Sequence, residues 1–193
     1  MIKSKSLYII DGSSYIFRAY FGIRQFLSTS TGFPTNALYG FINMLQKVVK
    51  DEKPDYLCVA FDSKEKTFRH DIYPEYKANR DAPPEDLVKQ FPYFEPLVAA
   101  YNIASLRVPG FEADDIIGTV ARRAEEAGGI ETFMVTPDKD FAQLVAPHTA
   151  MWKPGRQGSD HEVLTYEKIL KNWGISDPKQ VIDILGLWGD ASD

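Results

Sequence analysis

The strongest constraint in the sequence is a repeated pattern, in which a short apolar run ends at or just before an aspartate. The runs cover residues 7–10, 56–61 and 131–136, and the aspartates that follow are Asp11, Asp62 and Asp138. Apolar runs of roughly 4–8 residues between turn signals are typical of buried parallel strands. Because the carboxyl ends of parallel strands meet at one edge of a sheet, we expect the three aspartates to lie along that edge.

Segments with helical periodicity alternate with these strands. In residues 35–51, apolar side chains recur at three- and four-residue spacings. Pro84 suits the first turn of a helix that reaches about Tyr101, and another helix runs from Glu112 to Ala127. A further strand is expected at 104–108, and two helices at the C-terminal end, whose Trp173 and Trp188 we expect in the core. We therefore predict one α/β domain over residues 1–193, with a central, mostly parallel β-sheet flanked by helices.

Bulk composition limits the class of protein. The chain has 193 residues, of which 44% are hydrophobic, enough for the core of one domain. It contains no stretch of about 18 apolar residues and no apolar core of a signal peptide, so we predict neither a membrane span nor export. The single cysteine, Cys58, cannot form an internal disulfide, which agrees with a reduced cytoplasmic setting.

Each acidic residue, taken alone, has a purely structural explanation. Asp11 is placed to cap a helix, Asp114 and Asp115 are first-turn acids, and Asp138 and Asp140 suit an Asx turn. Taken together, these acids gather at one edge of the predicted sheet and are harder to explain as surface charges.

The acids in the first turn of the helix that begins at Glu112 are expected to point to different faces of that helix. Glu112 and Asp115 are three residues apart and therefore share a helix face. Asp114 is expected to point elsewhere unless the first turn is irregular.

Crowded carboxylates predict a site for hard cations. Several carboxylates in one pocket repel each other and raise each other's pKa values, and divalent cations relieve that repulsion. Oxygen ligands without His or Cys suit Mg²⁺ or Mn²⁺. Two such ions about 4 Å apart form the clamp that many enzymes use for phosphodiester displacement. We therefore predict a site for two Mg²⁺ or Mn²⁺ ions.

A set of motifs resembles the 5′-nuclease domain at the N-terminus of bacterial DNA polymerase I, a PIN-like family. The motifs are residues 7–15 with Arg18-Ala19-Tyr20, Phe61-Asp62, Phe68-Arg69, Tyr76-Lys77, Glu112-Ala113-Asp114-Asp115, Asp138-Lys139-Asp140 and Gly189-Asp190-Ala191-Ser192-Asp193. They occur in the family's order and cover nearly the whole chain. The resemblance implies a PIN-like fold with a helical arch at about 63–84, and metal-dependent removal of 5′ flaps and RNA primers in replication and repair.

The same resemblance implies roles for individual residues. The first metal site would comprise Asp11, Asp62, Glu112 and Asp114, with Asp115 beside it. The second would comprise Asp138, Asp140, Asp190 and Asp193. Among these acids, Asp11, Asp62 and Asp138 are expected to be catalytic, together with Lys77 near the scissile phosphate. The residues expected to bind DNA are Arg18, Arg69, Tyr76, Lys77 and Arg80.

Residues 64–80 carry a local positive charge, although the chain as a whole is negatively charged. The net charge of the chain is -5, whereas proteins that bind duplex DNA normally carry a basic surface. In this segment five basic residues oppose three acidic ones, and five minus three gives +2, with Tyr73 and Tyr76 interleaved. Such a segment can contact phosphates and stack an unpaired base, although a solvated surface loop is the alternative.

Two other functions stay open at this point. The chain can be a DNA-structure-binding module without catalysis, or a Mg²⁺ phosphohydrolase of small molecules. The second is disfavoured, because phosphatases with an aspartyl nucleophile usually have a second aspartate where this chain has Ser13.

The resemblance also bears on what surrounds the chain. In the family, a helix–hairpin–helix that grips duplex DNA follows the position of Asp193, so we expect this chain to be a fragment of a longer protein. We expect it to act as a monomer on DNA with a 5′ flap or 5′ end, in the nucleoid-associated part of the cytoplasm.

Overall fold

The chain folds around one mixed sheet. The structure, a computed structural model, describes residues 4–23, 25, 27–155 and 161–189. Within these residues a 6-stranded sheet has the order β3-β2-β1-β4-β5-β6. Its strands are β1 (Lys5–Asp11), β2 (Tyr56–Ala60), β3 (Ala104–Leu106), β4 (Ile130–Val135), β5 (Thr149–Lys153) and β6 (Glu162–Leu164). All neighbours pair in parallel except β5 and β6, so the predicted α/β fold with a mostly parallel sheet is confirmed.

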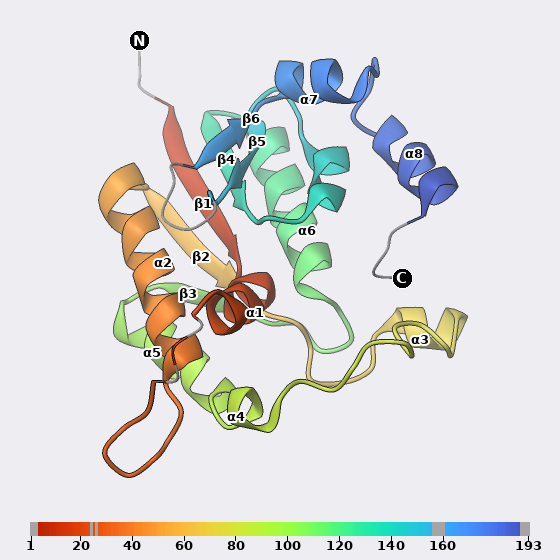
Figure 1. Cartoon of the computed structure of the whole chain (residues 1–193). Coiled ribbons are helices and arrows are strands. Elements are labelled where there is room, and N and C mark those ends of the chain that lie inside the picture. The colour runs from red at the N-terminus through yellow and green to blue at the C-terminus, as the bar shows by residue number, and fades with distance from the viewer. Residues whose placement is uncertain (1–3, 24, 26, 156–160, 190–193) are drawn as a thin grey trace.

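Helices cover both faces of the sheet (Figure 1). On the first face lie α1 (Gly12–Gly22), α2 (Asn36–Glu52), α4 (Glu85–Val88) and α5 (Phe94–Ala100). On the second face lie α6 (Ala113–Ala127), the 3-10 helix η2 (Lys139–Leu144), α7 (Tyr166–Trp173) and α8 (Gln180–Trp188). None of the helices in the described ranges is long and apolar enough to cross a bilayer.

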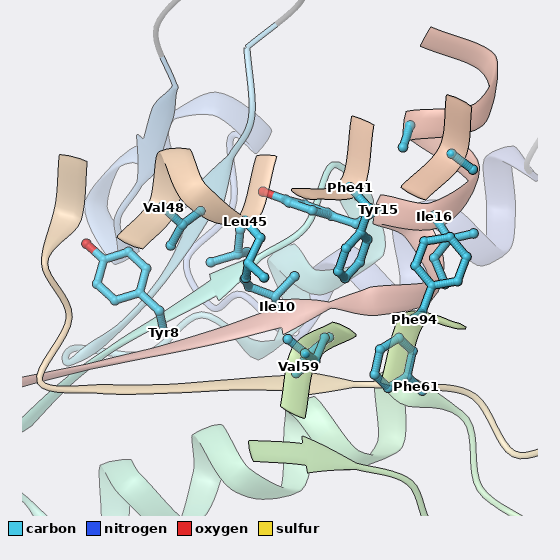
Figure 2. Close-up of a cluster of buried hydrophobic side chains, with 14 of the residues drawn as sticks. Tyr8, Ile10, Tyr15, Ile16, Phe41, Leu45, Val48, Val59, Phe61 and Phe94 are labelled. Carbon is cyan, nitrogen blue, oxygen red and sulfur yellow. The ribbon is translucent and has the colours of Figure 1, made fainter. Parts of the chain in front are cut away.

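The two cores follow from the alternation of side chains along β1. Ile10 points to the first face, where it packs in a cluster with Val59 of β2 and with Phe41 and Leu45 of α2 (Figure 2). Ile9 points to the second face and packs in the cluster that includes α6. Burial on both faces explains why these strands are apolar without interruption.

The arch segment, residues 63–84, joins β2 to α4 without entering the sheet. It contains one short helix, α3 (Phe68–Ile72), and in Figure 1 this helix projects away from the sheet. Because both ends of the segment are held by the body of the domain, it forms a loop that stands over the carboxyl edge of the sheet.

Several predicted elements differ from those in the structure. The helix expected from Pro84 to Tyr101 is broken into α4, the 3-10 helix η1 (Phe91–Tyr93) and α5, because Pro92 cannot donate a backbone hydrogen bond. Strands β5 and β6 were not predicted, since they are short and lie close to a Gly-rich loop. Cys58 is buried as expected and Trp173 is half-buried, but Trp188 is 82% exposed, so its place in the core was predicted wrongly.

Gly12 allows α1 to start directly against the end of β2. A Cβ atom built on Gly12 would meet the Ala60 carbonyl oxygen and a ring carbon of Phe61, each at 2.7 Å. The residue after Asp11 must therefore lack a side chain if α1 is to begin at the edge of the sheet.

We expect Gly12→Ala to lower the free energy of unfolding by about 1–3 kcal/mol, because the added methyl group forces a shift of backbone or of a buried ring. The control is Gly186→Ala in α8, where nothing described lies within 4 Å, and there we expect a gain of about 0.5–1 kcal/mol from helix propensity. Urea denaturation followed by circular dichroism measures both, and equal stabilities for the two variants would contradict the close contact.

Candidate active site

The parallel pairing of the strands brings the three strand-end aspartates together. In the register of the sheet, Asp11 lies opposite Ala60 of β2, and the preceding Ile10 lies opposite Val135 of β4. Asp62 and Asp138 therefore follow within three residues of positions that are aligned with the end of β1. Sequence separation along the chain is large, but the sheet places all three residues at one edge.

These aspartates line one pocket of ≈ 580 Å³ between the sheet edge and the arch. Its acidic lining residues are Asp11, Asp62, Asp114, Asp138, Asp140 and Glu75. Tyr73, Tyr76, Lys77 and Arg80 line it from the arch. The pocket thus has a carboxylate floor and a roof that carries cationic and aromatic side chains.

Hydrogen bonds fix the carboxylates at the end of β1 and in the turn after β4. Asp11 caps α1, accepting a hydrogen bond from the Ser14 amide at 2.9 Å and another from the Thr136 hydroxyl at 2.9 Å. The Thr136 oxygen also accepts the Asp138 amide at 3.2 Å, and Asp138 in turn accepts the Asp140 amide at 2.9 Å. The capping roles expected for single acids are therefore present, and they hold the acids in the pocket.

Burial and the neighbouring acids together shift the pKa of Asp114. Desolvation at the pocket wall, together with the charges of Asp11, Asp62 and Asp138, raises the pKa of Asp114 to about 7. Asp11 is only 2% exposed, and burial raises its pKa although its bonds to Ser14 and Thr136 act in the opposite direction. Both shifts show that the pocket disfavours a full set of negative charges.

The acids at the N-terminus of α6 point in two different directions. Asp114 lines the pocket, whereas Glu112 and Asp115 face the arch. The expectation that Asp114 points away from Glu112 and Asp115 is therefore confirmed, and Asp114 is the acid of this group that lines the pocket. Glu112 and Asp115 instead form a capping box at the helix start.

Three arch residues bind Glu112 and Asp115. The Lys77 ammonium lies 2.8 Å from Oε1 of Glu112, and the Tyr76 hydroxyl donates to Oε2 at 3.1 Å. Arg69 donates two hydrogen bonds to Asp115, each of 2.8 Å, and these lower the pKa of Asp115. Glu112 is only 6% exposed, so this contact anchors the arch in a largely buried position.

Lys77 is held in a specific way. Its backbone has φ 59, a left-handed conformation that non-glycine residues rarely adopt. Burial on its own lowers the pKa of Lys77, but the hydrogen bond and charge of Glu112 outweigh it, and the net shift is upward. Lys77 therefore stays charged in the pocket roof.

Two of the basic residues that we expected to bind DNA form their contacts outside the carboxylate pocket. Arg18 donates to the carbonyl groups of Pro154 and Gly155 and lines a separate groove between α1 and α2, so it does not reach the carboxylate pocket. Arg69 uses its guanidinium on Asp115 and does not line the pocket. Arg80 is exposed and lines the pocket as expected.

The sequence analysis missed several residues that shape the pocket. Ser13, Ser14 and Phe17 line it from the first two turns of α1, and Thr136 joins Asp11 to Asp138 from below. A signal was present only for Ser14, which lies about one helical turn after the capping Asp11 and therefore faces the same direction.

The donor chemistry of the pocket fits a hard divalent cation. Its acidic side chains present carboxylate oxygens, which Mg²⁺ and Mn²⁺ prefer, and burial together with neighbouring negative charges raises the pKa of Asp114, an effect that a cation would oppose. In the described part of the chain, no group of three or more His, Cys, Asp or Glu side chains is placed so that it could hold a metal ion. Asp190 and Asp193, expected as further ligands, lie outside the described residues.

Comparison with known proteins assigns the fold to a family. Residues 6–174 match the family described as 5′-3′ exonuclease, N-terminal resolvase-like domain. The chain belongs to this family. The chain is 41% identical over 189 residues to a 5′-3′ exonuclease from Aquifex aeolicus, covering 98% of this chain and 63% of the relative. It is also 41% identical over 189 residues to DNA polymerase I from Bacillus caldotenax, covering 98% of this chain but 21% of the relative.

Solved structures support the same fold. The chain aligns with a zinc-bound T5 5′-exonuclease at a TM-score of 0.73 and 20% identity, covering 98% of this chain and 68% of the other. A bacteriophage T5 flap endonuclease in complex with DNA and metal ions aligns at a TM-score of 0.72 and 18% identity, with the same coverage. At this identity the likeness concerns the fold.

The electrostatics of Asp114 predict how its amide variant behaves. A carboxyl group whose folded pKa is raised from 3.8 to about 7 destabilises the fold as pH rises through this window. We therefore expect Asp114→Asn to raise the melting temperature of the metal-free protein at pH 8, and to have little effect at pH 4. Differential scanning calorimetry in EDTA measures this, with the exposed Asp183→Asn in α8 as control, and an equal change at both pH values would contradict the predicted repulsion.

Proposed function

We propose that this domain hydrolyses phosphodiester bonds at the 5′ end or 5′ flap of DNA, with the help of two divalent metal ions. The observation that carries the proposal is the single pocket in which strand-end carboxylates face a cationic, aromatic arch. The chain spans 63% and 21% of the lengths of the two relatives described above, so the activity of the whole protein is part of the proposal.

The carboxylates of the pocket floor are the residues that would hold the ions. Asp11, Asp62, Asp114 and Asp138 supply oxygen ligands, with Asp140 beside them at the exposed rim. Glu112 and Asp115 support the site from behind, through their contacts with the arch. Bound Mg²⁺ or Mn²⁺ would activate water and neutralise charge on the scissile phosphate.

The arch supplies the positive charge that a nucleic-acid strand needs near this acidic floor. Lys77 and Arg80 line the roof and attract the phosphate backbone, while Tyr73 and Tyr76 offer rings on which unpaired bases stack. Because Arg69 is used to anchor the arch to Asp115, its role is to hold the roof in place. The roof is suited to a single strand, in keeping with a 5′ flap, and we extend the proposal to RNA primers.

The proposal also covers the oligomeric state and the cellular location of the protein. We infer that it acts as a monomer on nucleoid DNA in the cytoplasm. We also infer that residues 1–193 form a nuclease unit.

The direct test is cleavage of a 5′-flap duplex in Mg²⁺. We expect Asp62→Ala and Asp138→Ala each to lower the cleavage rate at least about 100-fold, because residues outside the ligand shell alone account for about 10- to 100-fold. Asp183→Ala, an exposed acid on α8, should cleave like the wild type. Binding of the flap without cleavage, in Mn²⁺ as well, would instead select the DNA-structure-binding module.

Metal binding should also stabilise the fold. An ion that binds only the folded protein, at a hundredfold excess over its dissociation constant, adds about 2.7 kcal/mol. For a domain of this size that corresponds to a rise in melting temperature of about 5–11 °C. Thermal melts with MgCl₂ or MnCl₂ test this, with Asp62→Ala as the matched control, and an unchanged wild-type melting temperature in millimolar metal would refute a metal site.

A further inference from the structure

Asp62 lies at a junction in the fold, between the buried strand β2 and the arch. The last sheet bond before it joins the Phe61 amide to the Leu106 carbonyl at 2.9 Å. From Ser63 onward the chain leaves the sheet and enters the arch. An acid at such a junction moves with the arch unless other contacts hold it.

Three elements hold Asp62 in place. Its amide donates to the Ser13 hydroxyl at 3.2 Å, and its Oδ1 accepts the Ala113 amide at 2.8 Å. Its carbonyl accepts a hydrogen bond from the guanidinium of Arg107, the residue that follows β3. The amide, the carboxylate and the carbonyl of one residue are thus tied to α1, to the start of α6 and to the end of β3.

Arg107 is itself fixed on the side of Asp62 away from the pocket. Its Nε donates to Glu95 of α5 at 2.5 Å, and its guanidinium lies 5.5 Å from the centroid of the Phe61 ring, within cation–π range. Arg107 is absent from the described lining of the carboxylate pocket. Any influence that it has on the pocket therefore passes through Asp62.

We propose that Arg107 is a positioning residue for the carboxylate of Asp62. The inference rests on the proposed function, because it assumes that Asp62 binds a divalent ion. With the carbonyl held by Arg107 and Oδ1 held by Ala113, the peptide and the carboxylate plane of Asp62 are both fixed, and Oδ2 is left for the pocket.

The alternative is that Arg107 only stabilises the fold through its ion pair with Glu95. Two variants separate these roles. Arg107→Met keeps an apolar stem beside Phe61 but removes the donors, and Arg107→Lys restores the charge but cannot donate to Asp62 and Glu95 in the same forked way. Arg122→Met removes an exposed arginine that pairs with Glu126 on α6, and serves as the matched control.

The primary readout is the affinity for Mn²⁺ alone, measured by isothermal titration calorimetry on the whole chain without DNA. We expect Arg107→Met to weaken Mn²⁺ binding about 10-fold, as is typical for residues that orient a metal ligand. Arg107→Lys should lie between this variant and the wild type, and Arg122→Met should bind like the wild type. Hydrogen exchange in the metal-free protein should become faster at the amides of residues 61–63 in Arg107→Met.

The outcomes are distinct. If the wild type binds Mn²⁺ and Arg107→Met binds it equally well, the positioning role is overturned, even where the variant has lost stability. If Arg107→Met does not fold, Arg107→Lys decides, and an Mn²⁺ affinity equal to that of the wild type would overturn the role. If the wild type binds no Mn²⁺, the proposed function fails, and the inference about Arg107 fails with it.

Discussion

Repulsion among carboxylates at one edge of the sheet is the interaction around which this domain is organised. Parallel pairing of β1 with β2 and β4 brings Asp11, Asp62 and Asp138 to the same edge, and α6 adds Asp114. Two apolar cores, one on each face, stabilise the sheet. Their stabilisation offsets the repulsion between the like charges at its edge. Burial and the charges of the neighbouring acids raise the pKa of Asp114 to about 7.

The structure reduces this cost in two different ways. Backbone amides and a hydroxyl satisfy the acids of the floor, as in the contacts of Asp11 with Ser14 and Thr136. Side chains of the arch neutralise the acids at the start of α6, with Lys77 on Glu112 and with Arg69 on the neighbouring Asp115. The arch is therefore a structural partner of α6 as well as the roof of the pocket, and its position depends on the same acids that surround the candidate metal site.

Sequence reasoning identified the strands that end at aspartates, since burial on both faces and the length of an apolar run are local properties. It did not say which acids at the start of α6 line the pocket, because that depends on where the N-cap of α6 falls. Nor did it find the partners of Arg18 and Arg69, which lie 136 and 46 residues away along the chain. Contacts of this kind depend on tertiary packing, and a single sequence carries no local signal for them.

The measurement that tests the central claim most directly is an anomalous difference map from crystals grown with MnCl₂. The account predicts Mn²⁺ peaks in the pocket, with oxygens of Asp11, Asp62, Asp114 and Asp138 as ligands at about 2.1 Å, the distance typical of small hard cations. Strong Mn²⁺ peaks only outside this pocket, or a pocket whose aspartates turn away from one another in saturating Mn²⁺, would contradict it.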